Sequence, residues 1–230
     1  DLFELIEHAR SLGLMVCLKT HGGHVTEQNA ERLAALGVSI VFVSYYSHRP
    51  EVHDAVTREP GSHGRTLQAL HYLVAAGLRV KVNCVVMERN ARDVPQVIEQ
   101  CAELGINVGF STEIHSALSG ADTPLDVALS VEDRVRFREA LDPKTSSCGV
   151  SSASNDWGDK RFCGAGTTGI YIDPEGKVMP CSFWPDVLGR LDGETRLSGL
   201  LDGSEKLQVM RAYKNADRHS CGGCAGKESC

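Results

Sequence analysis

Five cysteines in the last third of the chain are the residues whose type and spacing could bind a metal. Two of them, Cys163 and Cys181, flank Asp173-Pro174-Glu175-Gly176, a run of residue types that strongly favours a turn. This turn lies between two alternating segments, Gly169 to Ile172 and Lys177 to Met179, so we predict a β-hairpin with a cysteine at each foot. Such a hairpin brings the two thiols together. The other three cysteines come as the chain ends, at Cys221, Cys224 and Cys230.

Thiolates gathered in this way bind metal in a reducing compartment and form disulfides in an oxidising one. We see no signal peptide, and Cys17, Cys84 and Cys101 lie in apolar or helical segments where free thiols are usual. We therefore expect a cytoplasmic protein and a metal site. Zinc, as in zinc ribbons, and an iron–sulfur cluster both agree with the spacing.

The glycine and cysteine positions of this region resemble the SPASM domain, the auxiliary iron–sulfur module of radical S-adenosylmethionine (SAM) enzymes that modify peptides. The resemblance rests on Cys163, Gly176, Cys181 and the group Cys221-x2-Cys224-x5-Cys230. It implies that the first two cysteines hold one auxiliary [4Fe–4S] cluster and that the last three hold a second. The family pattern has two more cysteines, so we expect the chain to be truncated at its end.

Cys148 lies in a serine-rich, glycine-containing loop upstream of the hairpin. We consider it as an extra ligand or as a free loop thiol.

Length and charge restrict the remaining possibilities. The 230 residues can form one medium domain and one small domain, and 24 basic against 30 acidic residues give a net charge of −6. The charge balance does not suggest a basic surface for nucleic acid, and no apolar run is nearly long enough to cross a membrane. We expect no nucleic-acid or membrane partner.

The first half of the chain alternates helical and strand signals with short connections, which favours an α/β fold with a parallel sheet. The predicted helices cover residues 2–9, 26–36, 66–76 and 94–104, with a connecting helix at 131–141. The predicted strands cover 14–18, 38–44, 78–86 and 107–114, and a long loop follows the second strand. Because a β/α unit should begin with its strand, we expect the chain to begin mid-fold. We predict domains at 1–120 and 163–230, joined by a helix and loop at 121–162.

This first part resembles the partial (β/α)6 TIM-like barrel of radical SAM enzymes, lacking its first strands. The resemblance lies in the stretches 2–6, 18–22, 43–47, 50–57, 60–62 and 80–90. The family's C-x3-C-x2-C loop, which holds the SAM-cleaving cluster, and its Gly-Gly-Glu-Pro motif are not in this sequence. The resemblance therefore implies that this chain alone does not cleave SAM.

Ligands of α/β folds bind at the carboxyl ends of parallel strands, so we take these ends as the rim of the site. Thr20 ends the first predicted strand, and Ser44 ends the second at a position that contacts SAM in the family, where a hydroxyl can bond ribose or carboxylate oxygens. Arg65 has a guanidinium fork suited to the SAM carboxylate, with an ordinary surface arginine as the alternative. Asn83 lies in the next strand and needs a partner if buried. We predict that these four residues bind SAM and assign no catalytic residue.

Other polar residues near this rim have a structural interpretation beside a functional one. We expect either contact with a ligand or simple exposure to solvent for His21, Glu113 and His115. We expect Asn90 to serve a turn or a helix cap. Tyr45 and Tyr46 line the pocket or pack in the core.

By resemblance, the full enzyme would generate a 5′-deoxyadenosyl radical from SAM and modify a ribosomally made peptide, for example by a thioether or carbon–carbon cross-link. The implied cofactors are SAM and one or two auxiliary [4Fe–4S] clusters in this region. The implied partners are a peptide or protein substrate and a reductant such as flavodoxin or ferredoxin. The alternatives are a sulfatase-maturing radical SAM oxidase and a non-catalytic zinc or iron–sulfur scaffold that docks peptides.

Overall fold

The computed structural model describes residues 1–117, 119–140, 158–161, 163–184 and 186–217. The chain divides into two compact units, Asp1–Cys148 and Gly149–Cys230. Each unit has its own sheet.

The first unit contains a four-stranded parallel sheet in the order β1-β2-β3-β4, which confirms the predicted α/β fold. The strands are β1 (Cys17–Thr20), β2 (Ile40–Ser44), β3 (Val80–Val85) and β4 (Asn107–Ser111). The helices that precede and connect them are α1 (Leu2–Ser11), α2 (Glu27–Ala35), α3 (Pro50–Thr57), α4 (Ser62–Ala75) and α5 (Val94–Glu103). A short 3-10 turn (Thr123–Val127) and α6 (Val131–Ala140) follow β4.

The local sequence explains where these helices begin. The Thr26 side chain accepts a hydrogen bond from the Asn29 backbone N–H at 3.2 Å, which caps α2. Proline stands in the first turn of α3 and of α5, where its missing N–H costs no helical hydrogen bond.

The long loop predicted after the second strand is wrong, because it contains α3. Pro50 begins this helix, and Arg58 ends it in the left-handed conformation at φ 58°. Proline favours the first position of a turn as much as the start of a helix, and an arginine gives no signal of a helix end. The local sequence therefore does not distinguish this short helix from a loop. The strands are also shorter than predicted: β1 begins at Cys17 and β4 ends at Ser111.

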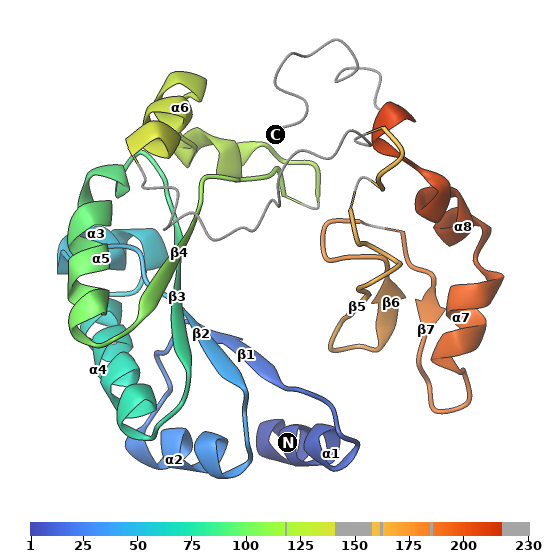
Figure 1. Cartoon of the computed structure of the whole chain (residues 1–230), viewed down its shortest axis with the longest axis horizontal. Helices are drawn as coiled ribbons and strands as arrows, with labels where there is room; N and C mark the ends of the chain where they lie inside the picture. Colours follow the sequence, from blue (N-terminus) through green and yellow to red (C-terminus); the bar gives the residue numbers. More distant parts are fainter. Residues whose placement is uncertain (118, 141–157, 162, 185, 218–230) are drawn as a thin grey trace. The chain divides into compact units, whose positions relative to one another are not determined.

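The alternation of side chains gives the sheet two different faces. Val41, Val43 and Val82 are buried on the face that α4 and α5 cover (Figure 1). The intervening residues point to the opposite face, which we call the inner face. One row of register partners across the inner face is Lys19, Phe42, Lys81 and Asn107, and the next row is Ser44, Asn83 and Gly109.

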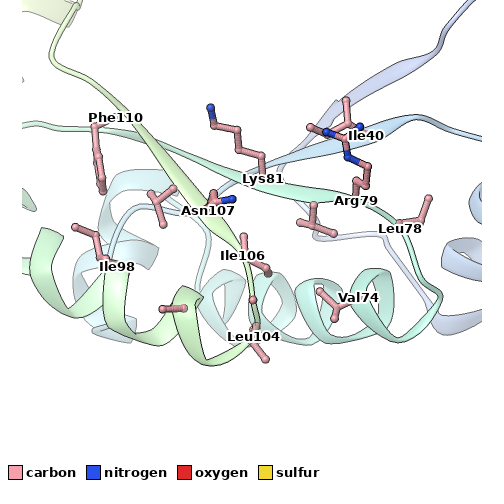
Figure 2. A pocket seen from close by; sticks show the side chains of 14 residues that line it. Ile40, Val74, Leu78, Arg79, Lys81, Ile98, Leu104, Ile106, Asn107 and Phe110 are labelled. Carbon is pink, nitrogen blue, oxygen red and sulfur yellow. The ribbon is translucent and has the colours of Figure 1, made fainter. Parts of the chain in front are cut away.

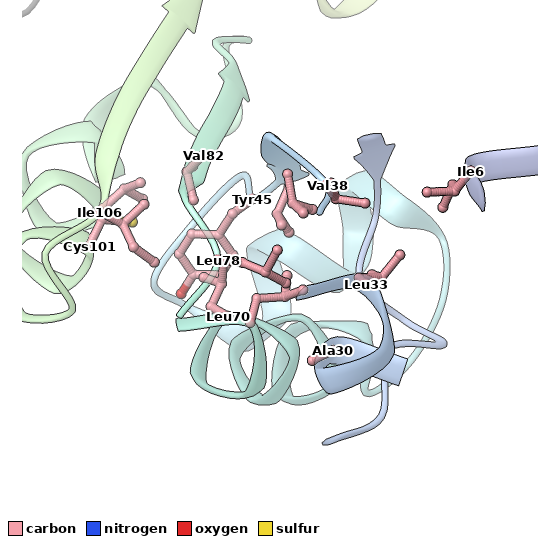
Figure 3. Packing of buried hydrophobic residues seen from close by; sticks show 14 residues of the cluster. Ile6, Ala30, Leu33, Val38, Tyr45, Leu70, Leu78, Val82, Cys101 and Ile106 are labelled. Atoms are coloured by element: carbon pink, nitrogen blue, oxygen red, sulfur yellow. The ribbon is translucent and has the colours of Figure 1, made fainter. Parts of the chain in front are cut away.

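The main core fills the space between the sheet and its helices, as Figure 3 shows. Leu70 and Leu73 of α4 are fully buried, and burying a side chain of this size contributes about 1.5–3 kcal/mol. The labelled members of this cluster are Ile6, Ala30, Leu33, Val38, Tyr45, Leu70, Leu78, Val82, Cys101 and Ile106.

The second unit contains the predicted hairpin. β5 (Tyr171–Ile172) pairs antiparallel with β6 (Lys177–Met179), and β6 also pairs with β7 (Gly189–Arg190), a strand that we did not predict. Two helices, α7 (Leu197–Gly203) and α8 (Glu205–Ala212), follow. Among the described residues, no helix is long and apolar enough to cross a membrane.

Candidate functional site

The two cysteines at the feet of the hairpin line one cavity. Cys163 is exposed, Cys181 is half-buried, and both thiols are free. The cavity has a volume of about 470 Å³. Its other lining residues are apolar or small: Gly164, Ala165, Thr168, Gly169, Ile170, Tyr171, Pro180, Ser182 and Phe183.

Backbone hydrogen bonds hold the segment after Cys163 against the segment before Cys181. The N–H of Gly166 donates to the carbonyl of Gly169 at 2.7 Å and to the carbonyl of Pro180 at 3.1 Å. The second bond joins residues that are fourteen positions apart, one three residues after Cys163 and the other directly before Cys181. The sequence therefore brings the two thiols to one site through the loop as well as through the turn.

The hairpin turn is fixed by its acidic residue and its glycine. Asp173 accepts hydrogen bonds at Oδ1 from the backbone N–H groups of Glu175 (2.9 Å) and Lys177 (2.8 Å). Gly176 has φ +83°, and a Cβ atom there would lie 2.8 Å from the carbonyl oxygen of Leu191. Only glycine meets both the backbone conformation and this close approach.

The donor set fits a thiophilic metal centre. Thiolates bind zinc and iron–sulfur clusters. Among the described residues, no group of three or more metal-ligating side chains occurs. The other candidate ligands lie outside the described residues: Cys148, Cys221, Cys224 and Cys230.

The ends of the parallel strands bring together two of the four predicted SAM-binding residues. Ser44 and Asn83 are register partners on β2 and β3, and both are half-buried on the inner face. The hydroxyl and the amide together offer donors and acceptors to a ligand with ribose or amino-acid groups.

The other two predicted residues lie elsewhere. Thr20 pairs with Val43 and therefore points to the helix-covered face, where its Oγ1 accepts the N–H of Gly22 at 3.0 Å. Arg65 is exposed at the start of α4, and its guanidinium pairs with Glu59 at 3.2 Å. The structure therefore does not gather these two side chains beside Ser44 and Asn83.

Lys81 is an inner-face residue that sequence reading did not single out. Its register partner is Asn107, but its side chain extends toward Gly109: a Cβ atom on Gly109 would lie 3.0 Å from Cε and 3.4 Å from Nζ of Lys81. The same Cβ would lie 3.6 Å from Oδ1 of Asn83. The ammonium group therefore lies at the level of Asn83. The signal was a lysine two positions before Asn83 in a strand whose other residues are apolar.

A larger cavity, of about 820 Å³, lies at the amino-terminal ends of β3 and β4, at the opposite ends of the strands from Ser44 (Figure 2). Figure 2 shows Lys81 projecting from the sheet away from the helices, whereas Val74 and Leu104 lie on the helix side. The stem of Lys81 thus borders this cavity while its ammonium group extends toward Gly109.

A buried polar cluster follows β2, and sequence reading missed most of it. The hydroxyl of Tyr45 donates to Oε1 of Gln100 at 2.6 Å and lies 3.0 Å from Nε2 of His63. His53 is fully buried, its Nδ1 accepts the N–H of Tyr46 at 3.3 Å, and its Nε2 has no partner among the described residues.

Burial determines the protonation of this cluster. Burial, together with the neighbouring His63, lowers the pKa of His53 to about 4, so its imidazole is neutral near pH 7. Burial also lowers the pKa of His63 and raises the pKa of Tyr45. The cluster is therefore an uncharged packing element behind the rim.

The turn role predicted for Asn90 is confirmed, and the structure also places the other residues near the rim. Asn90 serves a turn, since its Oδ1 accepts the N–H of Met87 at 2.7 Å and its Nδ2 donates to the carbonyl of Tyr46 at 2.9 Å. Tyr45 packs in the core. Glu113 and His115 are exposed after β4, and His21 is exposed after β1.

The described parts define a two-part class of protein: an α/β half-barrel with a polar inner face, and a small antiparallel unit with two free cysteines at its hairpin. Comparison with known families agrees with both parts. Residues 1–101 match the radical SAM superfamily, and residues 163–225 match SPASM, an iron-sulfur cluster-binding domain. The chain therefore belongs to the radical SAM superfamily and carries a C-terminal SPASM domain.

Individual relatives cover the whole chain at low identity. The AdoMet-dependent heme synthase of Methanosarcina barkeri is 24% identical over 100% of this chain and 72% of its own length. The mycofactocin maturase MftC of Mycobacterium tuberculosis is 26% identical over 100% of this chain and 61% of its own length. Streptococcus suis SuiB, solved with S-adenosylmethionine, has the same fold, with a TM-score of 0.64 and 16% identity over 100% of this chain and 57% of SuiB.

Proposed function

We propose that this chain is part of a peptide-modifying radical SAM/SPASM maturase that binds an auxiliary iron–sulfur cluster through Cys163 and Cys181. The observation that carries the proposal is that these two free thiols, far apart in sequence, line a single cavity. Iron–sulfur clusters are held by such thiolates. Cys221, Cys224 and Cys230 would complete the auxiliary ligand set.

The inner face of the half-barrel would bind SAM, and Ser44 and Asn83 would orient it. Both side chains are half-buried, so their hydrogen bonds to a ligand would be partly shielded from water. SAM and its cluster supply the radical chemistry when bound, and the protein contributes binding, orientation and exclusion of water. Thr20 and Arg65 would contribute less, since one faces the helices and the other is paired on the surface.

A peptide substrate agrees with the relatives. MftC is named as a maturase, and SuiB has also been solved bound to its precursor peptide SuiA. A cytoplasmic location and a reductant such as flavodoxin or ferredoxin would follow, because free thiols and reduced clusters need a reducing compartment.

A tetrapyrrole substrate is the second candidate. It is favoured by one observation, the match of the Methanosarcina barkeri heme synthase along the whole chain. Saturable binding of added mesoporphyrin, followed through its absorption band, would favour this candidate over a peptide. We expect no saturable change.

Anaerobic reconstitution of the chain with ferrous iron and sulfide tests the cluster. We expect bound iron, bound sulfide and a broad visible absorption, and we expect Cys163→Ala/Cys181→Ala to lose one cluster's share of the iron. Cys17→Ala, which removes an exposed thiol of the other unit, is the matched control and should leave the iron content unchanged. Binding of zinc without visible absorption, or an unchanged iron content in the double variant, would contradict the proposal and favour the docking scaffold.

Equilibrium binding of SAM to the reconstituted chain tests the inner face. We expect Asn83→Ala to weaken binding about tenfold, the cost of about one buried hydrogen bond. Asn107→Ala changes the same amide at the other end of the inner face and should have less than about a twofold effect. Equal losses in both variants would place SAM elsewhere.

A further inference from the structure

The strands present lysine but no acidic residue to the inner face of the sheet. The strand positions on this face include Lys19 and Lys81, and none of the strand positions from Cys17 to Ser111 that point to it is acidic. A surface of this kind favours an anionic ligand. SAM carries a sulfonium and an ammonium against one carboxylate, so its net charge does not account for this excess of lysine.

Lys81 has the more specific geometry of the two lysines. It is half-buried in the central strand β3, whereas Lys19 is exposed on the edge strand β1. Its side chain crosses over Gly109, where any larger residue would meet its Cε at 3.0 Å. The missing side chain at Gly109 therefore lets the ammonium group lie beside the Asn83 amide.

Phe42 gives this position an apolar neighbour. It is the register partner of Lys81 on β2, on the same face and half-buried. The ammonium group extends from Lys81 toward β4, whereas Phe42 lies on the β2 side of Lys81. A ligand with a carboxylate at one end and an apolar body at the other would match both. The ammonium has three donors, so it can bind a ligand oxygen together with another acceptor.

We propose that the ammonium group of Lys81 binds a carboxylate of the substrate on the inner face of the sheet, next to the Asn83 amide that orients SAM. The substrate class is thus an apolar or aromatic group that carries a carboxylate, such as a peptide C-terminus. This inference rests on the proposed function, and it adds the chemical group by which the substrate is held.

A titration of the full ¹⁵N-labelled chain with two small molecules of nearly the same shape tests whether the site binds a carboxylate. Binding is followed by the chemical shifts of the backbone amides. N-acetyl-L-phenylalanine carries the carboxylate, and N-acetyl-L-phenylalanine amide does not. We expect the acid to bind at least about tenfold more tightly, with shifts at Lys81 and Gly109, because hydrogen bonds to charged groups are strong. Equal binding of acid and amide would overturn the proposal without any variant.

Variants then locate the charge. Lys81→Met keeps the unbranched apolar stem, and we expect it to remove the preference for the acid. Lys19→Met removes a lysine of the same face and should retain the preference. Gly109→Ala displaces the Lys81 side chain without removing it, and we expect an intermediate loss. Equal losses in Lys81→Met and Lys19→Met would indicate only general attraction and would contradict the proposal.

SAM binding separates this inference from the proposed function. If Lys81→Met weakens SAM binding and leaves the acid preference intact, Lys81 serves the cofactor and the inference is wrong. If wild-type chain prefers the acid but binds neither iron nor SAM, the inference stands and the proposed function fails.

Discussion

Asp93 joins segments that follow different strands of the sheet. Its carboxylate accepts a hydrogen bond from the buried hydroxyl of Ser47 and a two-pronged interaction from Arg49, with Nη2 at 2.9 Å and Nε at 3.1 Å. Asp93 is 3% exposed, so it has little contact with water. The loop after β2 is thereby tied to the start of α5.

We expect Asp93→Ala to lower the free energy of unfolding of the first unit by about 2 kcal/mol, because it leaves the buried Ser47 hydroxyl without its acceptor, whereas the 45% exposed Arg49 can turn to water. Urea denaturation followed by circular dichroism measures this. Glu59→Ala breaks the exposed pair with Arg65 and is the matched control, with a cost below about 1 kcal/mol. Similar costs for both variants would mean that burial does not strengthen the Asp93 interaction.

His53 makes the stability of the first unit depend on pH. Its pKa is about 4 in the folded chain, below the ordinary value near 6.5, so the unfolded chain binds the proton more readily. Its contribution is therefore fully present above about pH 6.5 and is lost as the pH falls toward 4. His63 adds to this lowering of the pKa, whereas Asp54 opposes it.

Replacing His53 by Asn keeps an acceptor for the N–H of Tyr46 and removes the titration. We expect the wild-type chain to lose up to about 3 kcal/mol more than His53→Asn between pH 6.5 and pH 4. His71→Asn, on the exposed side of α4, should follow the wild-type pH profile. Parallel pH profiles of wild type and His53→Asn in urea denaturation would refute this assignment.

At the scale of elements, the hairpin depends on a glycine that no other residue can replace without movement. Gly176 has a positive φ and faces the carbonyl oxygen of Leu191, so it holds β5 and β6 close to the segment after β7. Gly193 has φ +93° but no neighbouring atom within 4 Å of an added Cβ. Both glycines therefore need a positive φ, but only at Gly176 would an added Cβ atom meet a neighbouring atom.

We expect Gly176→Ala to expose the hairpin amides to hydrogen exchange, with a loss of local stability at least about 1 kcal/mol greater than in Gly193→Ala. The additional loss comes from the contact with Leu191, because the strain of positive φ is common to both variants. Equal hydrogen exchange in the two variants would contradict this prediction, because it would show that the carbonyl of Leu191 moves away from the added Cβ without loss of stability.

At the scale of the whole molecule, the two units differ in how they are stabilised. The first unit has two hydrophobic clusters, whereas the described part of the second unit buries only Val178 and Leu207 among its large apolar residues. Small units with little core are commonly stabilised by metal. We therefore propose that the first unit, whose core extends beyond residue 120 to Leu129, is stable by itself and that the second unit depends on its cluster.

Removing the metal from reconstituted protein with a chelator should therefore affect the units differently. We expect the amides of β5 and β6 to lose protection from hydrogen exchange, while those of β2 and β3 retain it. The first unit serves as the internal control. Loss of protection in both units at once would indicate that they unfold cooperatively and that the boundary is not a stability boundary.

The sequence by itself determined the parallel α/β order, the hairpin with Cys163 and Cys181 at its feet, and the family. These follow from local signals: hydrophobic period, turn residues and fixed cysteine spacing. The helix α3 was missed because Pro50, at its first position, favours a turn as much as a helix start, and Arg58, where the helix ends, is not one of the residues that signal a helix end.

Only the tertiary structure decided which polar side chains meet. Register places Ser44 beside Asn83 and turns Thr20 to the helices, and a shift of one residue would reverse this assignment. The approach of Lys81 to Gly109 and the contact of Ser47 with Asp93 join residues from different strands and helices. Such contacts depend on how strands pair and helices pack, which local patterns in the sequence do not specify.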